Sequence, residues 1–419
     1  MVIKMYKAIF KFHNIGQGLF YSGVISDKKE RSFVFVYDCG SASQGCILNT
    51  EIDRFKENLN NNRIDLLVIS HFHYDHIKGI PYLLKNKTIK VDTVIMQDLS
   101  EIQKFENYLY YRKQNKKGDI ELSRLILNPI EYFLEKGVNK IVLVSNNDEN
   151  IGNYYTNDND KNDNNENNEN NANNQNDVNL IYHITINNNY IVNKKNNIIY
   201  VKNNMKCQNM LWEFCFACDK QTNMDIHNKI CEYLKNNNCT IKDLISCETK
   251  IKELIALLNI KPKPKFNESS MILVHHPIKQ SNRYNILYYK CRESVSCDYC
   301  YRCLKHNYYN YCYHGACSEN CNIPLSTILT GDVVLNNTIN NVIKQFVNHN
   351  IPIIFQVPHH GSKSNSVHHI SFINNYSKIC SIIPCGYMYN HPSDEIYCGL
   401  DRPYIVDVRY GYIYTIEIK

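Results

Sequence analysis

Residues 67–80 read LVISHFHYDHIKGI, and they carry the strongest chemical signal in this sequence. The stretch completes an apolar run, residues 64–70, of the length and composition expected for a buried β-strand. Polar side chains of two types follow that strand at once, and imidazole and carboxylate are groups that bind Zn²⁺ and similar ions. A surface loop that is merely rich in histidine does not explain this position after a buried strand. The candidate metal ligands here are His71, His73, Asp75 and His76.

Short motifs recur along the rest of the chain, and most of them join a predicted strand to a polar turn. In order they are NIGQG at 14–18, FVYDCG at 35–40, FNESSMIL at 266–273, LTGD at 329–332, VPHHGS at 357–362 and NHP at 390–392. Together with residues 67–80, this series resembles the signature of the metallo-β-lactamase-fold hydrolases. The particular set is most similar to the soluble hydrolase domain of bacterial DNA-uptake channel proteins.

The resemblance implies an α/β (α+β) fold, the four-layer αββα metallo-β-lactamase sandwich, with one metal cleft between the sheet edges. The predicted strands and helices are mixed in both halves of the chain, which agrees with a layered domain. Helices are expected at residues 52–59, 226–234 and 241–258, and a buried strand is expected at residues 353–357. The resemblance covers most of the chain apart from two insertions.

The resemblance also assigns roles to individual residues. The four polar residues of segment 71–76 match the primary metal-binding motif, and Asp332 matches the carboxylate that bridges two metals. Asp38 matches a carboxylate that orients the metal-binding loop from behind. His391 follows a later strand and is the preferred candidate for the last metal ligand.

His359 and His360 are adjacent at the end of a predicted strand. Neighbours on one backbone seldom reach the same point, so one of the pair is expected to have a structural role. The other could bind metal, donate a proton or hold a substrate phosphate; with Asp75 they are the catalytic candidates. The family usually has a further histidine before the bridging aspartate. His275 and His276 lie near that region without matching it, which leaves the number of metal ions open.

Seven of the eighteen cysteines fall between residues 291 and 321. Thiolates in overlapping C-x₂-C steps suit tetrahedral zinc, while an iron–sulfur cluster or unliganded and disulfide-bonded cysteines are alternatives. We expect a zinc-stabilised knuckle at the tip of a hairpin. Its tyrosines and basic residues could stack on a single nucleic-acid strand, or simply pack around the metal. The candidate structural zinc ligands are Cys291, Cys297, Cys300, Cys303, His306, Cys312, His314, Cys317 and Cys321.

The second insertion is a tract of asparagine and acidic residues with almost no apolar side chains. Such a segment cannot bury enough surface to offset the entropy of ordering, so a disordered insertion is expected. The expected divisions are a first half of the hydrolase domain (1–145), the Asn-rich insertion (146–179), a continuation (180–290), the Cys-rich insertion (291–323) and the completing second half (324–419).

The composition excludes several classes of protein. The 419 residues include 47 Lys and Arg against 41 Asp and Glu, and the formal charge of +6 permits a nucleic-acid partner without arguing for one. No run of 18 apolar residues exists, so no membrane span is expected. The N-terminus lacks the features of a signal peptide, and the cysteines are expected to be reduced rather than joined in disulfides, so a cytoplasmic location is predicted.

The function implied by the resemblance is hydrolysis by a metal-bound hydroxide, as a phosphodiesterase or nuclease acting on DNA or RNA. One or two zinc ions are expected in the cleft, with manganese as an alternative, and structural zinc in the Cys-rich insertion. A hydrolase of a small ester, thioester, lactam or cyclic nucleotide would use the same ligands. The sequence also permits a non-catalytic module that binds nucleic acid or protein through the Cys-rich insertion, and an effector of bacterial conflict that cuts phage or self DNA.

Overall fold

The fold is described by a computed structural model, in which the side chains of residues 286–293 and 412–418 are not described. The described residues are 6–27, 32–114, 118–145, 184–209, 211–218, 224–258, 270–278, 286–293, 326–347, 353–363, 371–372, 376, 379–386, 391–400, 403–408 and 411–418. The Asn-rich insertion predicted at 146–179 lies outside these ranges, as does all of the Cys-rich insertion except residues 291–293.

The first sheet contains ten strands among the described residues, in the order β13-β18-β1-β2-β3-β4-β5-β6-β9-β8. The strands β3, β4, β5, β6 and β9 pair in parallel, and the remaining pairs are antiparallel. The bounds are β1 Tyr6–Phe12, β2 Gly18–Asp27, β3 Ser32–Ser41, β4 Arg63–Val68, β5 Lys90–Gln97, β6 Lys140–Val144, β8 Ile191–Lys195, β9 Ile198–Val201, β13 Ile286–Glu293 and β18 Tyr412–Ile418.

The second sheet contains eight strands among the described residues, in the order β17-β16-β15-β14-β12-β11-β10-β7. Its β14 to β17 half is parallel, and its β7 to β12 half is antiparallel. The bounds are β7 Thr185–Ile186, β10 Lys206–Gln208, β11 Trp212–Cys218, β12 Met271–Pro277, β14 Ser326–Leu329, β15 Ile353–Gln356, β16 Ile379–Pro384 and β17 Tyr404–Val406.

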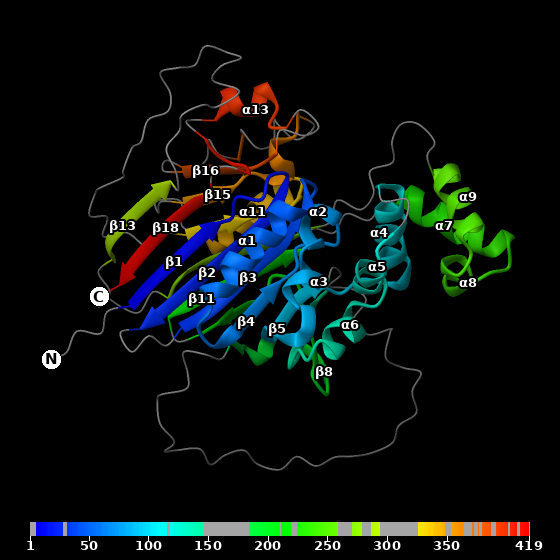
Figure 1. Ribbon diagram of the computed structural model, residues 1–419, viewed down its shortest axis with the longest axis horizontal. Helices are drawn as coiled ribbons and strands as arrows, with labels where there is room; N and C mark the ends of the chain where they lie inside the picture. The colour runs from blue at the N-terminus through cyan, green and yellow to red at the C-terminus, as the bar shows by residue number, and fades with distance from the viewer. Residues whose placement is uncertain are drawn as a thin grey trace.

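Helices cover the outer faces of the two sheets (Figure 1). The helices that follow β3, β4 and β5 pack on the first sheet, and the helices that follow β11 pack on those helices in turn. The helices α11 and α13 pack on the second sheet. The bounds are α1 Gly45–Glu57, α2 Tyr74–Ile77, α3 Ile80–Leu83, α4 Glu101–Gln114, α5 Ile120–Leu127, α6 Pro129–Glu135, α7 Met224–Asn236, α8 Ile241–Ile245, α9 Glu248–Leu258, α11 Asn337–Phe346 and α13 Asp394–Gly399, with short 3₁₀ turns η1 Asn60–Asn62, η2 Lys85–Lys87, η3 Asn188–Tyr190 and η4 Pro358–Gly361.

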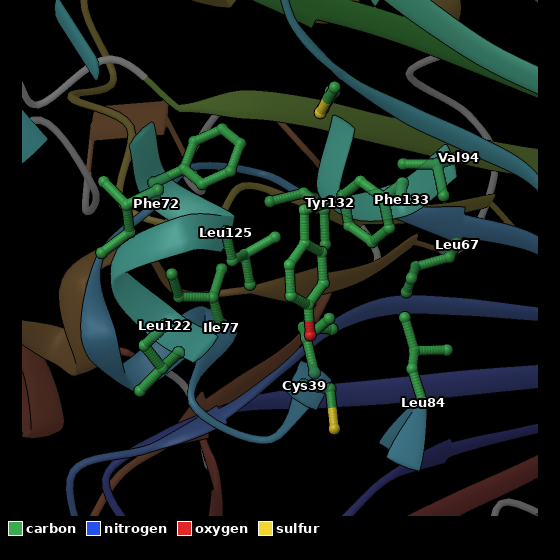
Figure 2. Packing of buried hydrophobic residues seen from close by; sticks show 14 of the residues in the cluster. Cys39, Leu67, Phe72, Ile77, Leu84, Val94, Leu122, Leu125, Tyr132 and Phe133 are labelled. Carbon is green, nitrogen blue, oxygen red and sulfur yellow. The ribbon is translucent and has the colours of Figure 1, made fainter. Parts of the chain in front are cut away.

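Three apolar cores separate the layers. Alternation along each strand sends one set of side chains between the sheets and the other set toward the helices. Between the sheets, for example, the rings of Phe35 on β3 and Phe214 on β11 meet edge to face at 5.1 Å. On the helical side, Tyr132 and Phe133 of α6 join Leu67 and Val94 in one buried cluster (Figure 2). The predicted mixed α/β fold with two multi-stranded sheets and helices is therefore confirmed.

The structure differs from the predictions in two places. The helix expected over 241–258 is two helices, α8 and α9, which are separated at Ser246 and Cys247. The strands on either side of the Cys-rich insertion, β13 and β14, lie in different sheets. The expected hairpin is therefore wrong, because β13 pairs with β18 rather than with its successor in the sequence.

Candidate metal centre

Asp38 anchors the loop between β4 and α2. It lies near the end of β3 with a φ of +55°, and its side chain is fully buried. Its Oδ1 accepts the Ser70 backbone N–H at 2.7 Å, and its Oδ2 accepts the Ser70 hydroxyl at 2.6 Å and Nδ1–H of His76 at 2.7 Å. Burial raises the pKa of Asp38, while the hydrogen bonds from His76 and Ser70 favour the carboxylate and oppose that rise.

The same network fixes the proton of His71. The Ser70 hydroxyl gives its hydrogen to Asp38, so its oxygen is left to accept from Nδ1 of His71, 2.9 Å away. His71 therefore carries its proton on Nδ1 and presents the lone pair of Nε2 to the centre of the site. Burial, and then the neighbouring charges of His76 and His73, lowers the pKa of His71 to about 3, which keeps the ring neutral.

His76 is held between two carboxylates. Its Nδ1–H bonds to Asp38, and its Nε2 faces Oδ1 of Asp332 at 3.2 Å. Burial disfavours a charged ring, but the carboxylates of Asp332 and Asp38 outweigh burial and raise the pKa of His76 well above its ordinary value. The position beyond Nε2 thus favours a cation, whether a proton or a metal ion.

Asp332, which follows β14, lies at the centre of the described imidazoles. Its Oδ2 is 3.6 Å from Nε2 of His71, 3.9 Å from Nδ1 of His73 and 3.4 Å from Nδ1 of His359, and its Oδ1 faces His76. Burial alone would raise the pKa of Asp332. The charges of His359 and His76 reverse that effect and hold the pKa well below its ordinary value.

A second group of candidate ligands lies around Asp75 at the start of α2. Nε2 of His360 is 3.1 Å from Oδ2 of Asp75, and Nδ1–H of His360 donates to the Pro384 carbonyl at 2.7 Å. Burial disfavours the imidazolium, yet the hydrogen bond to Asp75 raises the pKa of His360. Burial, and then the charge of His360, lowers the pKa of His391 to about 4, and Asp332 and Asp75 also act on it, so His391 lies beside the same group.

The adjacent pair His359 and His360 both reach this site. Each has a left-handed backbone, with φ of +50° and +53° within η4. Successive left-handed residues curl the chain tightly, so the two rings approach Asp332 and Asp75 respectively. The structure thus places both imidazoles at the centre, where the sequence predicted that one of them would have a structural role.

The donor atoms at this site fit a metal ion. The buried Nε2 atoms of His71, His73, His76 and His359 and Oδ1 of Asp332 have no hydrogen-bond partner among the described residues. Each buried polar atom without a partner costs about 1–3 kcal/mol, so a cluster of them is unfavourable unless a ligand satisfies it. Two sets of three residues bring their donor atoms within 4.8 Å of one another: His71, His76 and Asp332, and Asp75, His76 and His360.

Neither His275 nor His276 supplies a further ligand to this centre. His275 is fully buried between the sheets, where its Nδ1 accepts the Trp212 indole N–H at 3.0 Å and its Nε2 bonds to the Tyr21 hydroxyl at 2.8 Å. Burial holds the pKa of His275 well below its ordinary value. His276 faces the other side of β12, with Nε2 3.4 Å from Glu213.

Two contacts at the site were not predicted from the sequence. Ser270, just before β12, has its Oγ 3.4 Å from Nδ1 of His71 and accepts the backbone N–H of Asp332 at 3.2 Å. Tyr110 of α4 lies over His73, with ring centroids 4.5 Å apart. Ser270 lies in the FNESSMIL motif, but that motif predicted the entry to a strand and not a contact with His71. No motif marked Tyr110, and α4 itself was not predicted.

The structural zinc candidates cannot be placed in the same way. Cys297, Cys300, Cys303, His306, Cys312, His314, Cys317 and Cys321 lie outside the described residues. Cys291 lies in β13, for which only the backbone is described. A zinc site in this insertion stays a prediction.

The first part of the chain is similar to a known protein family. Residues 24–156 match the model of the Metallo-beta-lactamase superfamily. Two curated relatives, both named Ribonuclease Z, come from Lactococcus lactis subsp. cremoris strains MG1363 and SK11. Each is 39 % identical over 61 residues, which is 15 % of this chain and 18 % of the relative. The chain therefore spans less than a fifth of the length of these relatives.

Among solved structures, a crystal structure of a long form RNase Z from yeast aligns with 91 % of this chain and 37 % of that chain. The sequence identity is 10 % and the TM-score is 0.29, which is too low to establish a shared fold. Residues 24–156 are thus similar to the Metallo-beta-lactamase superfamily, and the two sheets with outer helices are consistent with that fold. Among the residues that the structure describes, no helix is both long and apolar enough to cross a membrane.

Proposed function

We propose that this protein is a metal-dependent hydrolase that cleaves phosphodiester bonds in DNA or RNA. The observation that carries the proposal is the group of buried, unpartnered imidazole nitrogens around the carboxylate of Asp332. The superfamily match supports a metallohydrolase, and the name of the two bacterial relatives supports a nucleic-acid substrate. The closer similarity to DNA-uptake hydrolase domains and the cytoplasmic location stay predictions.

We assign the ligands to two neighbouring positions. His71, His73 and His359 face Oδ2 of Asp332 and would hold one ion. His76 and Asp75, with His391 beside them, would hold the other, and Asp332 would serve both. Bound metal ions of this kind polarise a phosphoryl oxygen and lower the pKa of a coordinated water.

The remaining roles belong to the protein's own side chains. Asp38 and Ser70 fix the protons of His76 and His71 on Nδ1, so that each Nε2 points into the site. His360 keeps a proton on Nε2 against Asp75, and that proton is available to a departing alkoxide oxygen. We therefore assign His360 as the proton donor and His359 to metal binding.

The test is a comparison of substrates with metal-loaded full-length protein. We expect cleavage of single-stranded or structured DNA or RNA, and loss of cleavage together with bound metal in His71→Ala/His73→Ala. Hydrolysis of a thioester or lactam with no cleavage of nucleic acid would contradict the nuclease assignment while leaving the metallohydrolase assignment standing. Unchanged metal content in the double variant would contradict both.

A further inference from the structure

We propose a second metal site, for Zn²⁺ or a cation of similar ligand preference, formed by Glu213, Cys215 and His276 on the outer face of the second sheet. It does not depend on the proposed hydrolase function, because His276 points away from the metal centre. Its neighbour His275 faces the opposite side of β12, between the sheets.

Strand register brings the three side chains to one face. Glu213 and Cys215 are two residues apart on β11, so they project to the same side, and Glu213 pairs directly with His276 on β12. Cys215 packs in the core of the outer helical layer, whereas Phe214 between them packs between the sheets. The three candidate ligands are thus mounted on paired strands, which hold a site more rigidly than loops do.

The donor atoms are close enough to share one ion. Oε1 of Glu213 lies 3.4 Å from Nε2 of His276 and 3.4 Å from Sγ of Cys215, and all three donor atoms lie within 4.8 Å of one another. Thiolate, imidazole and carboxylate together are a ligand set that zinc accepts.

The hydrogen bonding of His276 points the same way. Its Nδ1 is 3.1 Å from the Pro277 carbonyl oxygen, which can only accept, so Nδ1 carries a proton. A neutral His276 then directs the lone pair of Nε2 at a carboxylate oxygen 3.4 Å away. Either a second proton on Nε2 or a metal ion satisfies this contact, and a backbone carbonyl on the opposite ring nitrogen is the usual support of a metal-binding histidine.

The local charge is balanced for a divalent cation. Cys215 is fully buried, and burial, followed by the charge of Glu213, raises the pKa of its thiol. A thiolate there would need a strong cation, and Zn²⁺ with one thiolate and one carboxylate is neutral. Lys206 lies 3.3 Å from Oε1 of Glu213 and over the ring of Phe346, so its ammonium pairs with the carboxylate and would have to give way to a bound ion.

The experiment measures zinc bound per chain, by elemental analysis after dialysis against buffered Zn²⁺, in the full-length protein. Cys215→Ser and His276→Asn should each bind one zinc fewer than the unmodified protein. Cys207→Ser is the matched control, because Cys207 is a buried thiol on the adjacent strand β10 that faces between the sheets. It should bind as many ions as the unmodified protein.

A second comparison separates this ion from those at the metal centre. The zinc lost in Cys215→Ser should add to the zinc lost in His71→Ala/His73→Ala when the three substitutions are combined in one chain. Glu213→Gln, at a partly exposed position, repeats the measurement if Cys215→Ser does not fold. Equal zinc content in Glu213→Gln, His276→Asn and the unmodified protein would show that Lys206 alone neutralises the group, and the proposal would be wrong.

Discussion

Nδ1 of His76 lies 2.7 Å from Oδ2 of Asp38, and neither side chain is exposed to solvent. The pair joins the end of β3 to the first turn after β4. Because Asp38 also holds both polar groups of Ser70, one carboxylate determines the proton positions of two imidazoles. The metal centre is therefore oriented by a residue that does not touch the ions assigned to it.

Asp38→Asn should lower metal affinity about 10- to 100-fold, the range seen for supporting partners of metal-binding histidines. An amide cannot accept from both Ser70 and His76 as the carboxylate does, so the Nε2 lone pairs would no longer be fixed. The measurement is competition with a chelator of known affinity.

Asp65→Asn is the matched control for that change. Asp65 is a buried carboxylate on the adjacent strand β4, where it accepts the backbone N–H of Val34 and forms an ion pair with Arg63 at 2.7 Å. It should lose stability without losing metal affinity. Equal affinity losses in both variants would show that the Asp38 effect is general destabilisation.

His360→Gln should slow cleavage most for substrates whose leaving group needs a proton. An oligonucleotide releases an alkoxide that needs a proton, whereas a phosphodiester with an activated aryl leaving group does not. We expect kcat to fall about 100-fold or more for the first and far less for the second. Equal loss for both substrates, together with lost metal, would assign His360 to metal binding instead.

Gly331→Ala should disrupt the centre through its backbone. Gly331 has a φ of +54°, and a Cβ there would lie 2.2 Å from Oγ of Ser270 and 2.9 Å from Oγ of Ser70. Both hydroxyls contact His71, so metal affinity should fall at least tenfold along with stability.

Gly137→Ala provides the comparison for Gly331→Ala. Its φ is +84°, but no atom lies within 4 Å of an added Cβ. It should show only the conformational cost of about 1 kcal/mol, with normal metal binding. Thermal unfolding and metal analysis of the two variants together separate backbone strain from steric displacement.

Glu106→Gln should change how stability depends on pH. Glu106 is buried on α4, 3.5 Å from Nδ1 of His227 on α7, and burial raises its pKa to about 7 from 4.5. Between these values the folded chain holds a proton that the unfolded chain has released, so the free energy of unfolding falls as pH rises. The variant should be about 3 kcal/mol more stable than the unmodified protein at pH 8 and almost equally stable at pH 4.5.

Urea unfolding at several pH values measures this difference. Glu101→Gln is the control, because Glu101 lies on the same helix with its side chain 75 % exposed. It should not alter the pH dependence. A constant offset between Glu106→Gln and the unmodified protein at all pH values would exclude titration of Glu106 as the cause.

Tyr110→Leu should weaken binding of a nucleic-acid substrate. The ring lies over His73 and is only partly buried, so a base next to the scissile phosphate can stack on it. Loss of one stacked base costs about 1–3 kcal/mol, or roughly 5- to 150-fold in KM, whereas Tyr110→Phe should retain binding. A substrate with an abasic site at that position should bind Tyr110→Leu and the unmodified protein equally.

Local motifs selected residues that the structure brings together, because each motif ends a strand at the same edge of the sandwich. The segment 71–76 and Asp332 were found in this way, and the structure brings them together. The sequence identifies His359 and His360 as candidates but predicts that only one of them reaches the site. It cannot show that both do, because two consecutive left-handed residues have no signature in a sequence.

Contacts that depend on pairing between distant segments could not be predicted. Ser270 contacts His71 although the two residues are 199 positions apart in the sequence. Glu213 meets His276 only through the register of β11 and β12. The wrong hairpin has the same origin. Local composition identified β13 and β14 as strands, but the choice of partner strand depends on burial across the whole sheet.

The split ligand set also governs when this protein can acquire its metal during synthesis. Asp332 follows His76 by 256 residues, a distance that a ribosome covers in roughly 13 to 50 s at ordinary rates. During that interval a nascent chain displays the imidazoles of segment 71–76 without the carboxylate that completes them. On the ligand assignment proposed above, an ion captured early would lack Asp332 and His359 and would exchange more readily than one bound after the second sheet has formed.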